Sequence, residues 1–200
     1  MIQKEIEYSE IFDAQEHFRV IMNATARPGS IHSLKEIEIY PPAPLNKAAA
    51  YVALALMNKD VTCNVQLTNT QEIETYLLLN TGVNFSEVEK ANFIICDQNV
   101  SVEVIENANE GDPIYPEQSA FIVLQVEEIS NAKLNNSIEL VLEGPGIEKT
   151  QNLYITGAQK QVLDTIWEKN SEYPLGVELI LCAANGQIAS IPRSSKIINQ

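Results

Sequence analysis

The chain has 200 residues, of which 13 are Lys or Arg and 27 are Asp or Glu, so its formal net charge at pH 7 is −14. Its 45% of hydrophobic residues can build a folded core, and its length fits one domain. The acidic balance excludes a nucleic-acid binder, which needs a basic stripe to displace counterions, and it excludes docking on an anionic membrane surface. The longest apolar run, Ala48–Met57, is too short to cross a bilayer.

The N-terminus and the cysteines both favour a cytoplasmic location. The first ten residues, MIQKEIEYSE, lack the basic and apolar stretches of a secretory signal peptide. Cys63, Cys96 and Cys182 lie in strand-like apolar runs, with no CxxC spacing and no histidine at ligand spacing. We therefore interpret the three cysteines as buried free thiols and predict no metal site.

The first predicted element is a helix that starts at its cap residue, Asp13. Glu16 follows three residues later, which is the spacing of a capping box. The Arg-Pro-Gly sequence at 27–29 ends this helix, and residues 30–34 are predicted to be extended. The apolar residues that share one helical face are Ala14, Phe18, Ile21 and Met22.

A second helix is predicted over Lys47–Met57, with Asn46 as its cap. It is apolar nearly all round, so we expect it to be buried on several sides, in the core or at a subunit interface. Residues 61–67 then alternate like a half-buried strand, and a third helix is predicted over Thr70–Leu79, closed by the Asn-Thr-Gly sequence at 80–82.

The rest of the chain is predicted to be mainly strands. A weak helix at 101–108, a loop at 110–119 and a helix at 158–169 separate them, and Asn185-Gly186 is the strongest hairpin signal. The pattern predicts a single α/β domain over residues 1–200, with a mixed sheet covered by helices. The predicted strands are 92–97, 120–126, 137–142, 152–155, 177–183 and 187–191.

Motifs that carry chemistry are scarce. The sequence contains no GxSxG, GxxxxGK[ST], HExxH or GxGxxG pattern. His17 and His32 are interpreted as core or surface residues rather than catalytic ones, and the scattered carboxylates as solvated. We therefore assign no catalytic residue.

The arginines are more informative, because only three of the basic residues are Arg. Arg27 precedes Pro-Gly at a helix end, and Arg193 follows Pro192 after the final hairpin, so rigid turns hold both. Such a guanidinium suits bidentate binding of a phosphate or carboxylate, but it can equally pair with an internal carboxylate or cap a helix. The Gly144–Gly146 turn has the same two interpretations, a backbone anion site or a plain tight turn.

Three parts of the sequence resemble one known family. Residues 18–29 (FRVIMNATARPG) resemble the opening motif of the H subunit of bacterial carbon–phosphorus lyase, and residues 143–147 (EGPGI) resemble its mid-chain glycine turn. Residues 173–181 (YPLGVELIL) and 191–195 (IPRSS) are similar to its C-terminal signature, which is the most specific of the three. The likeness covers nearly the whole chain in the right order.

This resemblance implies a fold, a process and partners. The fold would be a three-layer α/β/α arrangement with a mixed sheet, similar to that of the PLP-dependent transferases but without PLP. The process would be organophosphonate use, in which a phosphonate is attached to C1 of ribose from ATP and adenine is released. The partners would be the G, I and J subunits of a cytoplasmic core complex, and the isolated chain would be a homodimer.

The resemblance implies no catalytic residue and no cofactor. Pyridoxal phosphate needs a Schiff-base lysine and a phosphate cup, and none of the lysines lies in a recognisable cup. The residues that match the family motifs and are candidates for ligand binding are Arg27, Gly144, Gly146, Arg193 and Ser194.

Two functional hypotheses follow. In the first, the chain is a subunit of the carbon–phosphorus lyase core complex, and its acidic surface docks on more basic partners, since a charge of −14 repels a polyanionic nucleotide. In the second, it is a self-sufficient transferase-like enzyme that binds a small phosphorylated or phosphonylated ligand at a homodimer interface.

Overall fold

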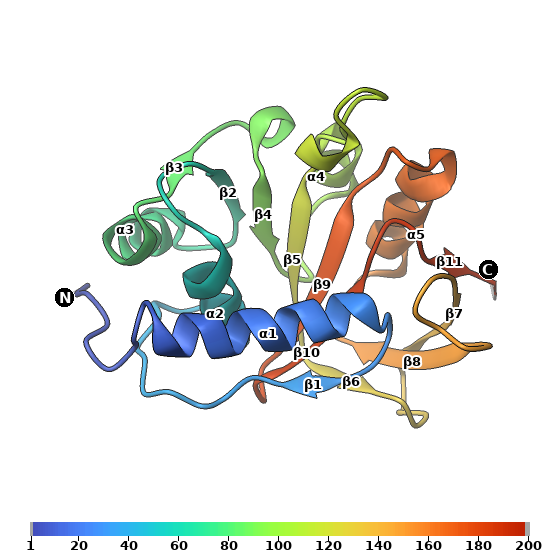
Figure 1. Ribbon diagram of the computed structural model, residues 1–200, viewed down its shortest axis with the longest axis horizontal. Coiled ribbons are helices and arrows are strands. Elements are labelled where there is room, and N and C mark those ends of the chain that lie inside the picture. The colour runs from blue at the N-terminus through green and yellow to red at the C-terminus, as the bar shows by residue number, and fades with distance from the viewer. Residues whose placement is uncertain (1, 199–200) are drawn as a thin grey trace.

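A mixed seven-stranded sheet runs through the centre of the computed structural model, which describes residues 2–198 (Figure 1). Its strand order is β1-β10-β9-β5-β4-β2-β3, in which the neighbours from β3 to β9 are parallel and β10 and β1 are antiparallel. The strands are β1 (His32–Ser33), β2 (Thr62–Gln66), β3 (Asn84–Phe85), β4 (Phe93–Cys96), β5 (Phe121–Val126), β9 (Glu178–Ala183) and β10 (Gln187–Ile191). The prediction of an α/β fold with a mixed sheet is confirmed.

Helices cover both faces of this sheet, because its buried strands are apolar on both sides. Ile95 and Val123 point into a cluster with α1, α2 and α3, whereas their neighbours Ile94 and Ile122 point into a second cluster with α4 and α5. The helices are α1 (Phe12–Ala26), α2 (Lys47–Leu56), α3 (Thr70–Thr81), α4 (Val102–Asn107) and α5 (Lys160–Lys169), and the 3₁₀ turns are η1 (Val88–Lys90), η2 (Pro116–Gln118) and η3 (Asn170–Glu172). None of these helices is long and apolar enough to span a bilayer.

A second, four-stranded sheet lies beside the second cluster, and the sequence did not predict it. Its order is β11-β7-β8-β6, with all neighbours antiparallel. Leu142 and Leu153 of this sheet join the cluster of α4 and α5. The strands are β6 (Glu128–Ser130), β7 (Ile138–Glu143), β8 (Gln151–Thr156) and β11 (Lys196–Ile197). The sequence predicts β7 and β8 but misses β6 and β11, which are too short to show alternation.

α1 begins at Phe12 with Ile11 at its cap position, so the assignment of the cap to Asp13 is wrong. The Phe12 N–H donates to Ser9 Oγ at 3.1 Å, and the Ser9 N–H donates to the Asp13 carboxylate at 2.9 Å. Asp13 lies inside the helix, where it reaches back toward Ser9. Ser9 thus supplies a side-chain acceptor to the first turn of α1, and the capping box predicted from Asp13 and Glu16 does not form.

The buried face of α1 also differs from the apolar face seen in the sequence. The buried residues are Asp13, His17, Ile21 and Ala24. Phe18 and Met22, by contrast, are 45% and 49% exposed. Both stripes have helical spacing, and hydrogen bonding of the polar residues decides which one faces the core.

α2 is a core helix. Asn46 caps it, accepting the Ala49 N–H at 2.8 Å, as predicted. Every residue from Ala48 to Ala53 is buried within the chain. Of the two locations that the sequence predicts for this helix, the core and a subunit interface, the structure shows the core. Its small side chains let α1 and the sheet pack closely around it.

The three thiols and the hairpin follow the sequence prediction. Cys63, Cys96 and Cys182 are buried and unpaired, and burial raises the pKa of each thiol. β9 and β10 are joined through Asn185-Gly186, and Gly186 has the left-handed φ of +84° that such a turn requires.

His17 lies fully buried beneath α1 in a polar cluster. Its Nε2 donates to the Lys35 carbonyl at 2.9 Å, and its Nδ1 accepts from the Tyr8 hydroxyl at 3.2 Å. The Tyr51 ring packs 4.6 Å from it between centroids, and Asp13 and Lys35 pair nearby at 3.1 Å. Burial lowers the pKa of His17, so the native state holds it neutral.

We expect the free energy of unfolding to fall as the pH drops below about 6.5, where the unfolded chain protonates His17 and the native chain does not. The slope is at most about 1.4 kcal/mol per pH unit for one group. His17→Gln is expected to flatten this slope in urea unfolding curves measured at several pH values. His32 has a lowered pKa too but is less buried, so His32→Gln should flatten it less; equal flattening contradicts the role of burial.

Candidate functional site

The segments that carry the family resemblance meet at one corner of the molecule. The turn between β7 and β8 contains Gly144 and Gly146, and it lies between the end of α1 and the segment that follows β10. A Cβ added to Gly144 would lie 3.0 Å from the carbonyl oxygen of Ser194, and one added to Gly146 would lie 2.2 Å from that of Ala26. The two glycines therefore allow backbone segments to pack directly on each other.

The turn itself has tight-turn geometry. The Ile147 N–H donates to the Gly144 carbonyl at 3.1 Å, with Pro145 and Gly146 in the two central positions. Gly146 has φ +84°, which the third position of a type II turn requires. The closing hydrogen bond uses the Ile147 N–H, so this donor is taken within the chain.

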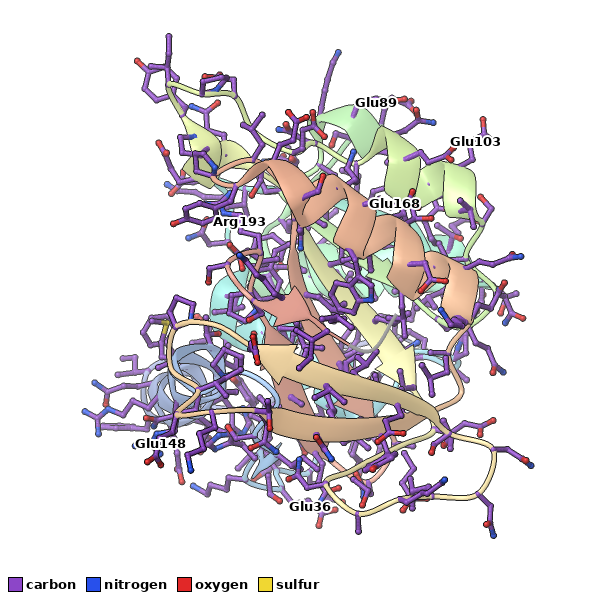
Figure 2. All side chains as sticks on the ribbon, turned by 90° about the vertical axis from the view of Figure 1, so that its right-hand side faces the viewer. Glu36, Glu89, Glu103, Glu148, Glu168 and Arg193 are labelled. Atoms are coloured by element: carbon purple, nitrogen blue, oxygen red, sulfur yellow. The ribbon has the colours of Figure 1, made fainter. Side chains whose placement is uncertain are left out.

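On one side of the turn lies a groove of about 480 Å³, which we call the Arg27 groove. Arg27, Gly146, Glu148, Lys149 and Gln151 are among its lining residues. Arg27 and Lys149 are both exposed, and within residues 2–198 neither forms an ion pair. Figure 2 shows Glu148 on this turn, beside the helix end. The groove thus offers two cations and one carboxylate.

Behind Arg27, a short hydrogen-bond chain fixes the backbone. The Ser30 hydroxyl donates to the Arg27 carbonyl at 2.5 Å, and Ser30 Oγ lies 2.8 Å from His32 Nε2. Because the hydroxyl has one proton, the His32 ring is the donor in the second contact. Burial and the charge of Arg27 lower the pKa of His32, so the imidazole is neutral near pH 7.

Arg193 is engaged within the chain. Its Nε lies 3.2 Å from a carboxylate oxygen of Glu178, and its Nη1 donates to Ser119 Oγ at 2.8 Å and to the Pro116 carbonyl. Figure 2 shows Arg193 below the loop that carries η2. This is the internal pairing that the sequence left open as an alternative. The guanidinium ties this loop to β9.

On the other side of the turn lies a cavity of about 620 Å³ beside α5, which we call the α5 cavity. Its wall includes Trp167 of α5, Tyr173 and the consecutive residues 193–197, as well as Pro145 of the turn. Ser195 is 7% exposed, and its Oγ has no hydrogen-bond partner in the part of the chain that the structure describes. A volume of this size is within the range of small-molecule sites.

The predicted site residues are therefore divided between two hollows. Arg27 and Gly146 line the Arg27 groove, and Arg193 and Ser194 line the α5 cavity. Gly144 lies in the turn that separates them. Among residues 2–198, no group of three His, Cys, Asp or Glu side chains is placed to hold a metal ion.

Sequence reasoning missed three residues at this corner. Lys149 joins Arg27, and Trp167 and Lys196 line the α5 cavity. Trp167 is the only tryptophan, but no spacing in the sequence links it to the 193–197 segment. Only the packing of α5 beside β11 brings them together.

Comparison with known proteins identifies a family for this arrangement. The family model described as "Bacterial phosphonate metabolism protein (PhnH)" matches residues 8–198. A Rhizobium meliloti protein named alpha-D-ribose 1-methylphosphonate 5-triphosphate synthase subunit PhnH is 27% identical over 190 residues, covering 94% of this chain and 91% of its own length. HtxG of Stutzerimonas stutzeri, provisionally named a C-P lyase subunit protein, is 28% identical over 184 residues, covering 92% of this chain and 85% of its own. All three matched segments lie inside the region that the family model covers, and the chain belongs to the PhnH family of bacterial phosphonate metabolism proteins.

Proposed function

We propose that this chain is a non-radical subunit of a cytoplasmic carbon–phosphorus lyase core complex, needed for organophosphonate use. It takes part in forming alpha-D-ribose 1-methylphosphonate 5-triphosphate from phosphonate and ATP, with release of adenine. The observation that carries this proposal is the family match over residues 8–198, together with relatives named as subunits of that synthase and of C-P lyase. The partners are the G, I and J subunits, and the chain without them is a homodimer.

The surface of α1 supports a role as a subunit. Phe18 and Met22 are four residues apart and exposed, so they form one stripe on the outer side of the helix. Large exposed apolar groups on a strongly acidic chain favour a partner that is apolar at the contact and basic around it. Two further apolar residues, Ile11 and Phe12, are exposed at the start of the helix.

In this function, the residues that contact a ligand lie at the corner where the turn between β7 and β8 meets the end of α1 and the segment after β10. No residue of this chain is assigned a catalytic role. Arg27, with Lys149 beside it, contacts an anionic ligand in the Arg27 groove. Gly144 and Gly146 hold the turn, and Arg193 and Ser194 belong to the α5 cavity. Helices on both faces of the central sheet support a three-layer fold like that of the PLP-dependent transferases, without the cofactor.

A second function is a self-sufficient transferase-like enzyme that binds a small phosphorylated or phosphonylated ligand at a homodimer interface. The two hollows favour it, because each is large enough for such a ligand. It predicts ligand binding without partners, whereas the subunit function predicts stable association with them.

The deciding experiment is co-expression of this chain, as the only tagged component, with candidate G, I and J subunits. Size-exclusion chromatography with mass determination then shows what elutes with it. We expect co-elution in a fixed ratio, well above the mass of a homodimer. Elution as a homodimer beside folded, untagged partners contradicts the subunit function and favours the second one.

The same experiment tests the α1 stripe through Phe18→Asp. Because Phe18 is 45% exposed, the variant is expected to keep its fold, yet to lose at least about tenfold in the affinity that holds the complex. Leu79→Asp is the matched control, since Leu79 is equally exposed, lies on α3 and undergoes the same change of charge. Equal loss of co-elution in both variants, or none in Phe18→Asp, contradicts docking through α1.

A further inference from the structure

One sulfur atom of the chain differs from the others in its exposure. Cys63, Cys96 and Cys182 are fully buried, and burial raises the pKa of each thiol, which suppresses the thiolate form that oxidants attack. Met57 lies in the core and is 5% exposed, whereas Met22 on α1 is 49% exposed. Within residues 2–198, the Met22 thioether is therefore the sulfur most open to a dissolved reagent.

Met22 lies on the outer side of α1, away from the core. The buried stripe of this helix consists of Asp13, His17, Ile21 and Ala24. Figure 1 shows α1 across the front of the molecule, and no helix or strand of the described residues is drawn in front of it. Met22 and Phe18 are one turn apart and both exposed, so a polar atom added to Met22 changes the α1 stripe and not the core.

We propose that Met22 is an oxidation site, and that its conversion to the sulfoxide by a peroxide weakens docking through the α1 stripe. In this step a lone pair of Met22 Sδ attacks one oxygen of the peroxide, and the O–O bond breaks. The sulfur keeps that oxygen and is oxidised, while the other oxygen takes up the remaining proton and leaves as water, or as an alcohol from an organic peroxide. The inference rests on the proposed function, and it adds a chemical control of assembly to it.

The sulfoxide opposes docking because its oxygen is a hydrogen-bond acceptor. In the free chain water solvates this oxygen. When an apolar partner surface covers Met22 and Phe18, the oxygen loses its water without gaining a donor, and the desolvation costs binding free energy. The same cover keeps a peroxide away from Met22 Sδ in the assembled complex. Oxidation therefore acts on the chain before assembly, and methionine sulfoxide reductases can restore the thioether.

The first test measures where a peroxide reacts in the isolated chain. Trypsin does not cleave between Arg27 and Pro28, so it places the methionines in separate peptides, at residues 1–4, 20–35 and 48–59, and mass spectrometry assigns each sulfoxide. Hydrogen peroxide is expected to oxidise Met22 at least about tenfold faster than Met57, because Met57 is buried. The urea unfolding midpoint should stay the same when Met22 alone is oxidised. Equal rates at the two residues, or a large loss of stability, overturn the assignment of the site.

The second test measures assembly. The tagged chain is treated with hydrogen peroxide, freed of it by catalase and mixed with untreated G, I and J subunits. We expect the sulfoxide form to bind them with at least about fivefold lower affinity than the untreated chain, and a sulfoxide reductase to reverse the loss. Met22→Leu is the matched control. It has an apolar side chain of similar size without sulfur, so its affinity should be the same before and after treatment.

The outcomes separate this inference from the proposed function. Co-elution of the untreated chain, with the same affinity after oxidation of Met22, contradicts this inference alone, and so does an equal loss in treated Met22→Leu. Failure of the untreated chain to co-elute contradicts the subunit function, whereas the peptides still decide whether Met22 is the oxidation site. In the assembled complex, Met22 is expected to oxidise at least about fivefold more slowly than in the free chain. Equal rates show that no partner covers Met22 and overturn its control of docking.

Discussion

Gly146→Ala is expected to destabilise the chain by about 2–5 kcal/mol, the sum of left-handed backbone strain and overpacking. Gly146 has φ +84°, and an added Cβ would lie 2.2 Å from the Ala26 carbonyl oxygen and 3.0 Å from Pro28 Cδ. Neither neighbour is the flexible end of a side chain, so the backbone at the end of α1 must shift. Urea unfolding measures the loss directly.

Gly186→Ala is the control for this prediction. Gly186 has the same φ of +84°, but an added Cβ would meet nothing within 4 Å. The Gly186→Ala variant is therefore expected to lose only the free energy that corresponds to backbone strain, about 1–2 kcal/mol. Equal losses in the two variants would show that the contact between the turn and α1 is less rigid than the structure describes.

Arg193→Met is expected to cost about 3 kcal/mol near pH 7, because it leaves a largely buried carboxylate without its partner. The side chains of Arg193 and Glu178 are 15% and 25% exposed. The variant also releases Ser119 Oγ and the Pro116 carbonyl, so the loop of η2 loses its tie to β9. Arg27→Met is the control, because Arg27 is exposed and forms no ion pair with any described residue. This variant should lose no more than about 0.5 kcal/mol of unfolding free energy.

The pH dependence of the Arg193→Met variant has a defined sign. Burial raises the pKa of Glu178 above its usual value even though Arg193 opposes the shift, and removal of Arg193 raises it further. A raised native pKa means that stability falls as the pH rises through that pKa. The deficit of the variant should therefore shrink as the pH is lowered, and Glu178→Gln in the same chain should recover much of it. A deficit that stays constant with pH contradicts the role of the Glu178 charge.

Sequence signals that span only a few residues were sufficient to predict many of the helices and strands. Asn46 caps α2, and Gly82 ends α3 with φ +74°. The Asn185-Gly186 pair marks the hairpin of β9 and β10. In each case the residue's own side chain or backbone freedom fixes the local geometry, so the sequence predicts the element.

The features that were missed depend on distant partners. β11 exists because Lys196 and Ile197 pair with β7, more than fifty residues earlier, and α1 buries His17 rather than Phe18 because Tyr8 and the Lys35 carbonyl supply hydrogen bonds. The site follows the same rule. The approach of Gly146 to Ala26 spans 120 residues, and no local pattern encodes it.

The pairing of β1 with β10 gives the molecule a particular order of assembly. His32 lies opposite Ile188, so a strand made early in translation has no partner until almost the whole chain has left the ribosome. α1 packs on the same C-terminal hairpin, but it also packs on α2, which is synthesised soon after it. The parallel strands β2, β4 and β5 can associate before then. β9 is synthesised after these strands and just before β10, and it lies between β5 and β10 in the sheet. The nascent protein therefore carries β1 without its partner strand for most of its synthesis, and its final hairpin closes the fold.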